Sequence, residues 1–223
     1  MTATATQPVL VILGGGGHAA VVAESAVRAG WRVAGIAAAD GGDLGDPDGA
    51  GAARIAEHLA RGAKLHAAVG AADVRARWMA RFGEAAFATI IDPTSHVSIS
   101  ATVGAGCAIG AGAVVNARAV LHAGTIVNTR AVVEHDCTVG PCAHIAPGAI
   151  LCGSVRVGQG AQVSAGAVVI PGRVIGARSV VGAGAVVVRD VPEGATAVGV
   201  PARTISSSPS SPPQPTRSRS RRA

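Results

Sequence analysis

The sequence predicts an α/β domain of Rossmann-like type followed by a parallel β-helix of hexapeptide repeats. Three observations lead to this fold class. An apolar run that ends in four glycines opens the chain, segments of strand and helix length alternate up to about residue 90, and an aliphatic residue recurs at every sixth position from Ile91 to Val187. A period of six fits neither an α-helix nor a flat strand, and it is typical of a coil of short strands joined by corners.

The first 90 residues contain the alternating elements of the α/β domain. Strands are expected at 8–13, 31–36 and 64–69, and helices at 19–29, 53–61 and 73–82. The first strand leads through a glycine turn into a helix that ends near Gly30, and the next strand follows directly. This order is that of a βαβ unit with a parallel sheet.

The glycine turn, Gly14 to Gly17, precedes His18. It places backbone N–H groups at the start of a helix, where they can hold a phosphate. As a dinucleotide fingerprint it is incomplete, because three alanines stand before Asp40 where an acid usually ends the second strand. The diphosphate of a nucleotide sugar is therefore favoured over NAD, with a purely structural turn as the alternative. His18 either contacts the phosphate or caps the turn.

The hexapeptide register begins at residue 91 and continues for 97 residues. We expect each aliphatic, and the small residue four positions later, to face inward, while glycine-rich segments turn the corners. Cys107 and Cys137 occupy small inward positions, whereas Cys142 and Cys152 are expected at corners near the proposed groove. The aliphatic series is Ile91, Val97, Val103, Ile109, Val115, Leu121, Val127, Val133, Val139, Ile145, Leu151, Val157, Val163, Val169, Ile175, Val181 and Val187.

Composition and charge narrow the class of protein further. Hydrophobic residues make up 49% of the chain but only four are aromatic, so the core must be aliphatic. Four of the arginines behind the net charge of +6 lie in the segment 206–223, which is rich in Ser and Pro and is expected to be a disordered tail. Nucleic-acid binding is therefore not favoured.

The sequence also bears on where the protein is located. No apolar run is long enough for a membrane span and no basic segment precedes the first strand, so we expect a cytoplasmic protein without membrane insertion.

Both halves together resemble the NeuD/PglD-type bacterial sugar acetyltransferases over residues 8–205. The resemblance rests on Leu13-Gly-Gly-Gly-Gly-His18, Asn128-Thr-Arg-Ala-Val-Val-Glu-His-Asp-Cys137, His144-Ile-Ala-Pro-Gly-Ala149, Ile170-Pro171-Gly172 and Gly199-Val-Pro-Ala-Arg203. It implies domains at 1–90 and 91–205, the second a left-handed β-helix that transfers acetyl from acetyl-CoA to a nucleotide-linked amino sugar. It also implies a homotrimer with active sites between neighbouring β-helices, and no metal.

The same resemblance assigns the site residues. His135 matches the catalytic base, Asp136 the carboxylate that orients it, His144 a residue near the acetyl group, and Gly153 the position whose N–H faces the thioester carbonyl. Asn128 belongs to the same motif and is placed with the residues that bind the sugar substrate, which are Gly14, Gly16, Gly17, His18, Asp40 and Asn128.

The register supports part of this assignment independently. His135 comes two positions after Val133, which places it at an outward corner, and Gly153 follows 18 residues later, one coil of three hexads further on. A histidine can take the proton that an attacking amine must lose, and the tetrahedral oxyanion needs a donor.

Several alternatives stay open. O-acetylation of a sialic-acid-like sugar would use the same base, and a β-helix that binds a nucleotide sugar without activity would need no base. A three-histidine zinc site of the β-helical carbonic anhydrase kind requires two His five residues apart, but His122, His135 and His144 are separated by 13 and 9 residues. We expect His96 and His122 to be surface residues.

Overall fold

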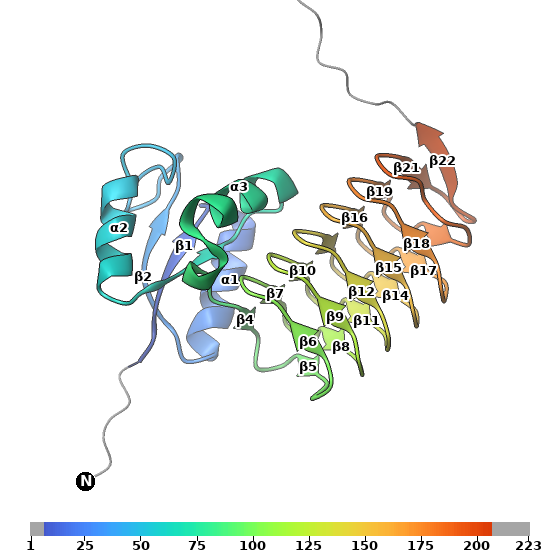
Figure 1. The fold of residues 1–223 in the computed structure, drawn as a ribbon, viewed down its shortest axis with the longest axis horizontal. Helices are drawn as coiled ribbons and strands as arrows, with labels where there is room; N and C mark the ends of the chain where they lie inside the picture. The colour runs from blue at the N-terminus through green and yellow to red at the C-terminus, as the bar shows by residue number, and fades with distance from the viewer. Residues whose placement is uncertain (1–6, 207–223) are drawn as a thin grey trace, which may run out of the picture.

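The structure is a computed structural model that describes residues 7–206, so nearly all of the predicted tail lies outside the described residues. The N-terminal domain has every predicted element in the predicted order (Figure 1), with boundaries shifted by one or two residues. Its parallel sheet has the strand order β2-β1-β3. The elements are β1 (Val9–Leu13), α1 (Gly17–Arg28), β2 (Arg32–Ala37), α2 (Ala52–Ala60), β3 (Lys64–Ala67), α3 (Ala72–Phe82) and the 3₁₀ turn η1 (Glu84–Ala86).

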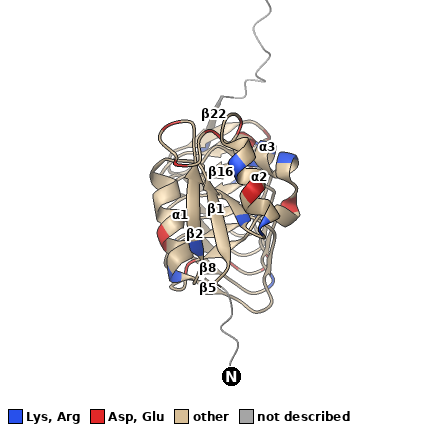
Figure 2. Cartoon of the chain, turned by 90° about the vertical axis from the view of Figure 1, so that its left-hand side faces the viewer, with Lys and Arg blue, Asp and Glu red and all other residues tan. Residues whose placement is uncertain are grey.

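The central strand β1 is buried on both faces, which is why its sequence is continuously apolar. Leu10 and Ile12 pack with residues of α1, whereas Val11 and Leu13 pack with residues of α2 and α3. Successive side chains of a strand point to opposite faces, so one strand serves both layers. The view along the β-helix shows α1 on one side of the sheet and α2 and α3 on the other (Figure 2).

The β-helix confirms the hexapeptide register. Seventeen two-residue strands run from β4 to β20, and the second residue of each is the aliphatic of the predicted series. Their bounds are Ile90–Ile91, His96–Val97, Thr102–Val103, Ala108–Ile109, Val114–Val115, Val120–Leu121, Ile126–Val127, Val132–Val133, Thr138–Val139, His144–Ile145, Ile150–Leu151, Arg156–Val157, Gln162–Val163, Val168–Val169, Val174–Ile175, Val180–Val181 and Val186–Val187.

Residues 18 apart pair in parallel and build three sheets. Ile126 pairs with His144 in the first sheet, Val132 with Ile150 in the second, and Thr138 with Arg156 in the third. The first sheet holds β4, β7, β10, β13, β16, β19, β21 (Thr196–Val198) and β22 (Arg203–Ser206). The second holds β5, β8, β11, β14, β17 and β20, and the third holds β6, β9, β12, β15 and β18.

The corners follow a second rule with the same period. From Gly106 to Gly184, every sixth residue has a positive φ, and this residue always stands three positions after an inward aliphatic. Glycine adopts this left-handed conformation without strain, and Asp tolerates it better than most residues. The six positions without glycine are Arg118, Arg130, Asp136, Cys142, Ser154 and Arg178.

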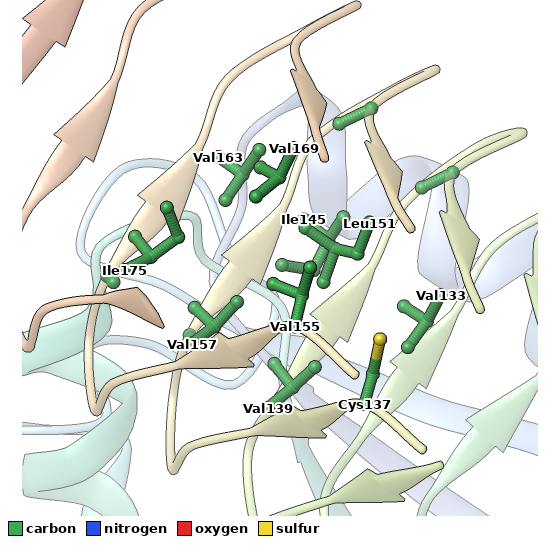
Figure 3. Close-up of a cluster of buried hydrophobic side chains, with 14 of the residues drawn as sticks. Val133, Cys137, Val139, Ile145, Leu151, Val155, Val157, Val163, Val169 and Ile175 are labelled. Atoms are coloured by element: carbon green, nitrogen blue, oxygen red, sulfur yellow. The ribbon is translucent and has the colours of Figure 1, made fainter. Parts of the chain in front are cut away.

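The core of the β-helix is a set of stacked aliphatic columns. Val139, Val157 and Ile175 form one such column, and Cys137 and Val155 stack beside it (Figure 3). Cys107 and Cys137 are fully buried, as predicted. The expectation that each aliphatic of the hexapeptide series faces inward fails for Ile91. This residue is 37% exposed because it belongs to the first coil and no earlier coil covers it.

The two domains meet through α1, α3 and the first sheet. Asp92 has a fully buried side chain, and it accepts hydrogen bonds from Arg28 Nη2 (2.6 Å) and Ser25 Oγ (2.7 Å) of α1. Cys142 lies at a corner of the β-helix, as predicted, but α3 covers this corner: Cys142 is 4% exposed and packs with Trp78 and Met79. None of the described helices is long and apolar enough to cross a membrane.

Candidate active site

His135 lies at the corner that follows β11, and its imidazole is held by the next residue. The ring Nδ1 is 2.8 Å from Asp136 Oδ2. A carboxylate only accepts, so Nδ1 carries the proton and Nε2 keeps a lone pair for an incoming proton. The side chain of His135 is 55% exposed, and its Nε2 has no hydrogen-bond partner among residues 7–206. The pair therefore presents a basic nitrogen at the surface of one β-helix edge.

Arg118 fixes the carboxylate from the preceding coil. Its Nε lies 2.7 Å from Asp136 Oδ1 and its Nη2 lies 2.9 Å from Oδ2. These two charge-assisted hydrogen bonds, together with the bond from His135, hold the pKa of Asp136 well below its usual range. Sequence reasoning missed Arg118, although its position 18 residues before Asp136 was a usable signal.

Gly153 lies one coil after His135, against the imidazole. A Cβ at position 153 would be 2.6 Å from His135 Cε1 and 2.7 Å from Nε2, so only glycine leaves room for the ring. The Gly153 N–H has no hydrogen-bond partner within the described part of the chain, whereas its carbonyl accepts from Gly172 N. A free N–H beside a basic nitrogen can donate to an oxyanion.

His144, Asn128 and His18 form a second group, at the junction of the domains. Asn128 Nδ2 donates to His144 Nε2 (3.2 Å), since Asn128 Oδ1 already accepts from Thr129 N. The His18 ring lies 6.5 Å from the His144 ring, centroid to centroid. Burial lowers the pKa of His144 to about 4, with smaller effects from Arg75 and His18, so this imidazole is neutral near pH 7.

The glycine turn and the His18 side chain that follows it face different parts of the molecule. Gly14, Gly15 and Gly16 line a cavity of about 480 Å³ in the N-terminal domain, whereas His18 points to the β-helix. Gly17 is the first residue of α1, and the helix therefore directs its N-terminal N–H groups at the turn. His18 makes no side-chain hydrogen bond that caps α1; its ring packs toward His144, and its buried Nε2 has no partner among the described residues.

Asp40, which follows the second strand, lines the same cavity as the glycines. Sequence reasoning missed the opposite wall, which comes from the loop between β2 and α2 and from α3. There Asp48 accepts hydrogen bonds from Arg77 Nη2 (2.8 Å) and Trp78 Nε1 (3.1 Å). The remaining lining residues are Ala38, Ala39, Asp46, Pro47 and Val69.

Within one chain, the predicted residues do not all converge. Asn128 follows β10 at the corner between the first and second sheets, and His144 begins β13 of the first sheet. His135 follows β11, so it lies at the corner between the second and third sheets. The second sheet separates the edge of His135 from the edge of Asn128. Residues 7–206 contain no group of three His, Cys, Asp or Glu side chains that could hold a metal ion.

Comparison with known proteins places the chain among solved sugar acetyltransferases. Residues 9–82 match the family described as the PglD N-terminal domain. PerB from Caulobacter crescentus, solved with CoA and GDP-perosamine, is 39% identical, and the match covers 90% of this chain and 98% of that one with a TM-score of 0.82. The acetyltransferase domain of PglB from Neisseria gonorrhoeae FA1090, solved with acetyl coenzyme A, is 33% identical over 89% of this chain and 100% of that one, with a TM-score of 0.78.

A comparison with curated proteins gave no match. The two structural matches nonetheless span both domains, and they agree with the left-handed β-helix that the resemblance implies. On this evidence, the chain belongs to the NeuD/PglD-type family of sugar acetyltransferases.

Proposed function

We propose that this protein transfers an acetyl group from acetyl-CoA to the amino group of a nucleotide-activated 4-amino-4,6-dideoxy sugar, with His135 as general base. The observation that carries the proposal is the position of the His135 imidazole. It is hydrogen-bonded to Asp136 and lies against Gly153, whose N–H is free among the described residues. The relative PerB, solved with CoA and GDP-perosamine, supports the choice of co-substrate and of a nucleotide-linked amino sugar.

The reaction needs no covalent intermediate on the enzyme. The neutral amine attacks the thioester carbonyl carbon, and His135 Nε2 takes the proton that the nitrogen loses as the new C–N bond forms. The carbonyl oxygen becomes an oxyanion that accepts a hydrogen bond from the Gly153 N–H. When the C–S bond breaks, the CoA sulfur receives the proton from Nε2, which restores the base.

The N-terminal domain binds the nucleotide in this proposal. The N–H groups of the glycine turn and the N-terminus of α1 favour a diphosphate, and the cavity of about 480 Å³ has room for a nucleoside. Asp40 is an exposed carboxylate in that cavity and can accept hydrogen bonds from hydroxyl groups. His18 then stands between the nucleotide cavity and the β-helix.

We further propose a homotrimer in which His135 of one copy meets His18, Asn128 and His144 of the next. The argument is the separation of these residues on different edges of a single chain. Light scattering should then give three times the chain mass of 21.7 kDa. A monomeric mass in an active preparation would contradict the arrangement.

Mixed trimers test the shared site directly. His135→Ala and His18→Ala should each be inactive, but trimers reassembled from equal amounts of both should regain about one quarter of the sites, because one site in four takes its intact residue from each copy. No recovery in verified mixed trimers would place both residues in the same chain's site.

The reaction itself is tested by mass spectrometry of the products. Purified protein and acetyl-CoA are incubated with a GDP-linked 4-amino sugar, UDP-linked 4-amino-4,6-dideoxy sugars, and free and CMP-linked sialic acids. One acetyl should appear on an amino sugar, and the rate should fall by about 10²–10⁴-fold in His135→Asn but not in the surface variant His122→Asn. Acetylation of sialic acid alone would favour the O-acetyl alternative, and no acetylation at all would favour the inactive one.

A further inference from the structure

Arg75 is a buried cation that the proposed chemistry does not use. It lies in α3 and is 1% exposed. Its guanidinium donates only to carbonyl oxygens, and no carboxylate pairs with it in the described part of the chain. A buried charge without a counter-ion is costly, and an apolar side chain of similar size is often more stable in such a place. Packing alone therefore does not explain why this buried position holds a charged arginine with several hydrogen-bond donors.

The carbonyl groups that Arg75 contacts come from both domains. Nη1 donates to Val69 O and Gly70 O, both at 2.8 Å, in the loop between β3 and α3. On the β-helix side, Nε donates to Gly124 O (3.0 Å), and Nη2 donates to Cys142 O and, at 3.4 Å, to Ala143 O. One rigid, planar group thus joins a loop of the first domain to two successive coils of the second.

Both ends of this link belong to the site. Val69 lines the nucleotide cavity, and it touches the glycine turn so closely that a Cβ on Gly14 would lie 2.6 Å from Val69 Cγ1. Ala143 directly precedes His144, the first residue of β13. The guanidinium therefore spans from the wall of the cavity to the backbone that carries His144.

We propose that Arg75 is a positioning residue that holds the nucleotide cavity in register with His144, so that a sugar bound through its diphosphate reaches the histidines at the domain junction. This inference rests on the proposed function, because it takes the cavity beside Gly14 as the nucleotide site. Arg75 touches neither substrate nor transferred acetyl group in this proposal. It acts through Val69 and Ala143.

Three variants distinguish the effect of the branched guanidinium of Arg75, the effect of its charge, and a general effect on folding. Arg75→Lys keeps the charge, but its single nitrogen cannot reach the loop and both coils at once. Arg75→Met removes the charge as well. The exposed Arg61→Met at the end of α2 serves as the matched control. Arg75→Lys should raise KM for the nucleotide sugar about tenfold and lower kcat, with KM for acetyl-CoA unchanged, and Arg75→Met should have larger effects in the same direction.

The histidines give a readout that does not need turnover. His144 faces Arg75 of α3, His18 of α1 and the neutral Asn128 that follows β10, while His18 also lies near His66 of β3. Arg75 contributes to the lowered pKa of both His18 and His144, after the larger effect of burial. NMR titration of the ring protons should show both pKa values rising in Arg75→Met and staying low in Arg75→Lys and Arg61→Met.

The outcomes distinguish this inference from the proposed function. If the natural protein acetylates no sugar but the titrations shift as stated, the proposed function fails and the placement of Arg75 beside the histidines stands. If it is active and both Arg75 variants lose activity only in proportion to their folded fraction, with KM and the titrations unchanged, Arg75 is a packing residue and the inference is overturned.

Discussion

Arg118 and Asp136 occupy the same corner in successive coils, both in the left-handed region with φ of 59° and 60°, and they are joined by two hydrogen bonds. Asp136 in turn accepts from His135 Nδ1. The orientation of the proposed base therefore depends on a residue 17 positions earlier, which the coil geometry brings to its side.

Arg118→Met should loosen the carboxylate that orients His135. Without the two hydrogen bonds, the pKa of Asp136 should rise toward its usual value, because its depression comes first from Arg118. We expect kcat to fall about tenfold, with little change in KM for acetyl-CoA or for the nucleotide sugar. Steady-state kinetics across pH check this, with Arg118→Lys expected to recover part of kcat. An unchanged kcat in Arg118→Met would contradict the role of the contact.

Gly153→Ala should displace the His135 ring while leaving the fold intact. The added methyl would occupy the place of the imidazole, and a shift of about 1 Å in a catalytic group can lower a rate about 10²-fold. Gly194→Ala is the opposite case, because the surroundings of Gly194 are open but its φ is 65°. This variant should lower the free energy of unfolding by about 1 kcal/mol and leave kcat unchanged. Thermal unfolding and kcat measured on both variants separate the two effects. Full activity in Gly153→Ala would mean that the ring position is not critical.

Asp40→Asn should weaken binding of the nucleotide sugar. The carboxylate lines the cavity beside the glycine turn, and an amide would offer a poorer acceptor for sugar hydroxyl groups. KM for the nucleotide sugar should rise about tenfold while kcat stays near that of the natural protein. Glu57→Gln on the exposed face of α2 provides the control. Equal KM values in the two variants would exclude Asp40 from binding.

Asp92 should make the free energy of unfolding depend on pH in the acidic range. Hydrogen bonds from Arg28, Thr94 and Ser25 hold its pKa well below the usual range. A lowered folded-state pKa means that the contribution is complete above the unfolded value, near 4, and is lost as the pH falls below it. Asp92→Asn should reduce the free energy of unfolding by about 2 kcal/mol at pH 7 and flatten its decline between pH 5 and pH 3. Urea unfolding at several pH values measures both, and parallel curves for the two proteins would refute the assignment.

Much of the β-helix could be predicted from the sequence, since its rules are local. The period of six fixes which residue of each hexad faces inward, and the stacking of residues 18 apart follows from three hexads per coil. The same arithmetic placed His135 at a corner and Gly153 one coil later. It failed at Ile91, where the end of the stack leaves the inward position uncovered.

The junction of the domains could not be predicted in this way. His18 beside His144, Arg28 on Asp92, Arg75 between the loop at Val69 and the coil at Cys142, and the burial of Cys142 under α3 all join residues more than 60 positions apart. No repeat relates such pairs, because they depend on how a helix-covered sheet docks on one face of the β-helix. By itself, the sequence determined the coil, its core columns, the glycine turn and the edge of the proposed base. Only the tertiary structure decided which buried charges and imidazoles meet, because that follows from the packing of two surfaces and not from any spacing along the chain.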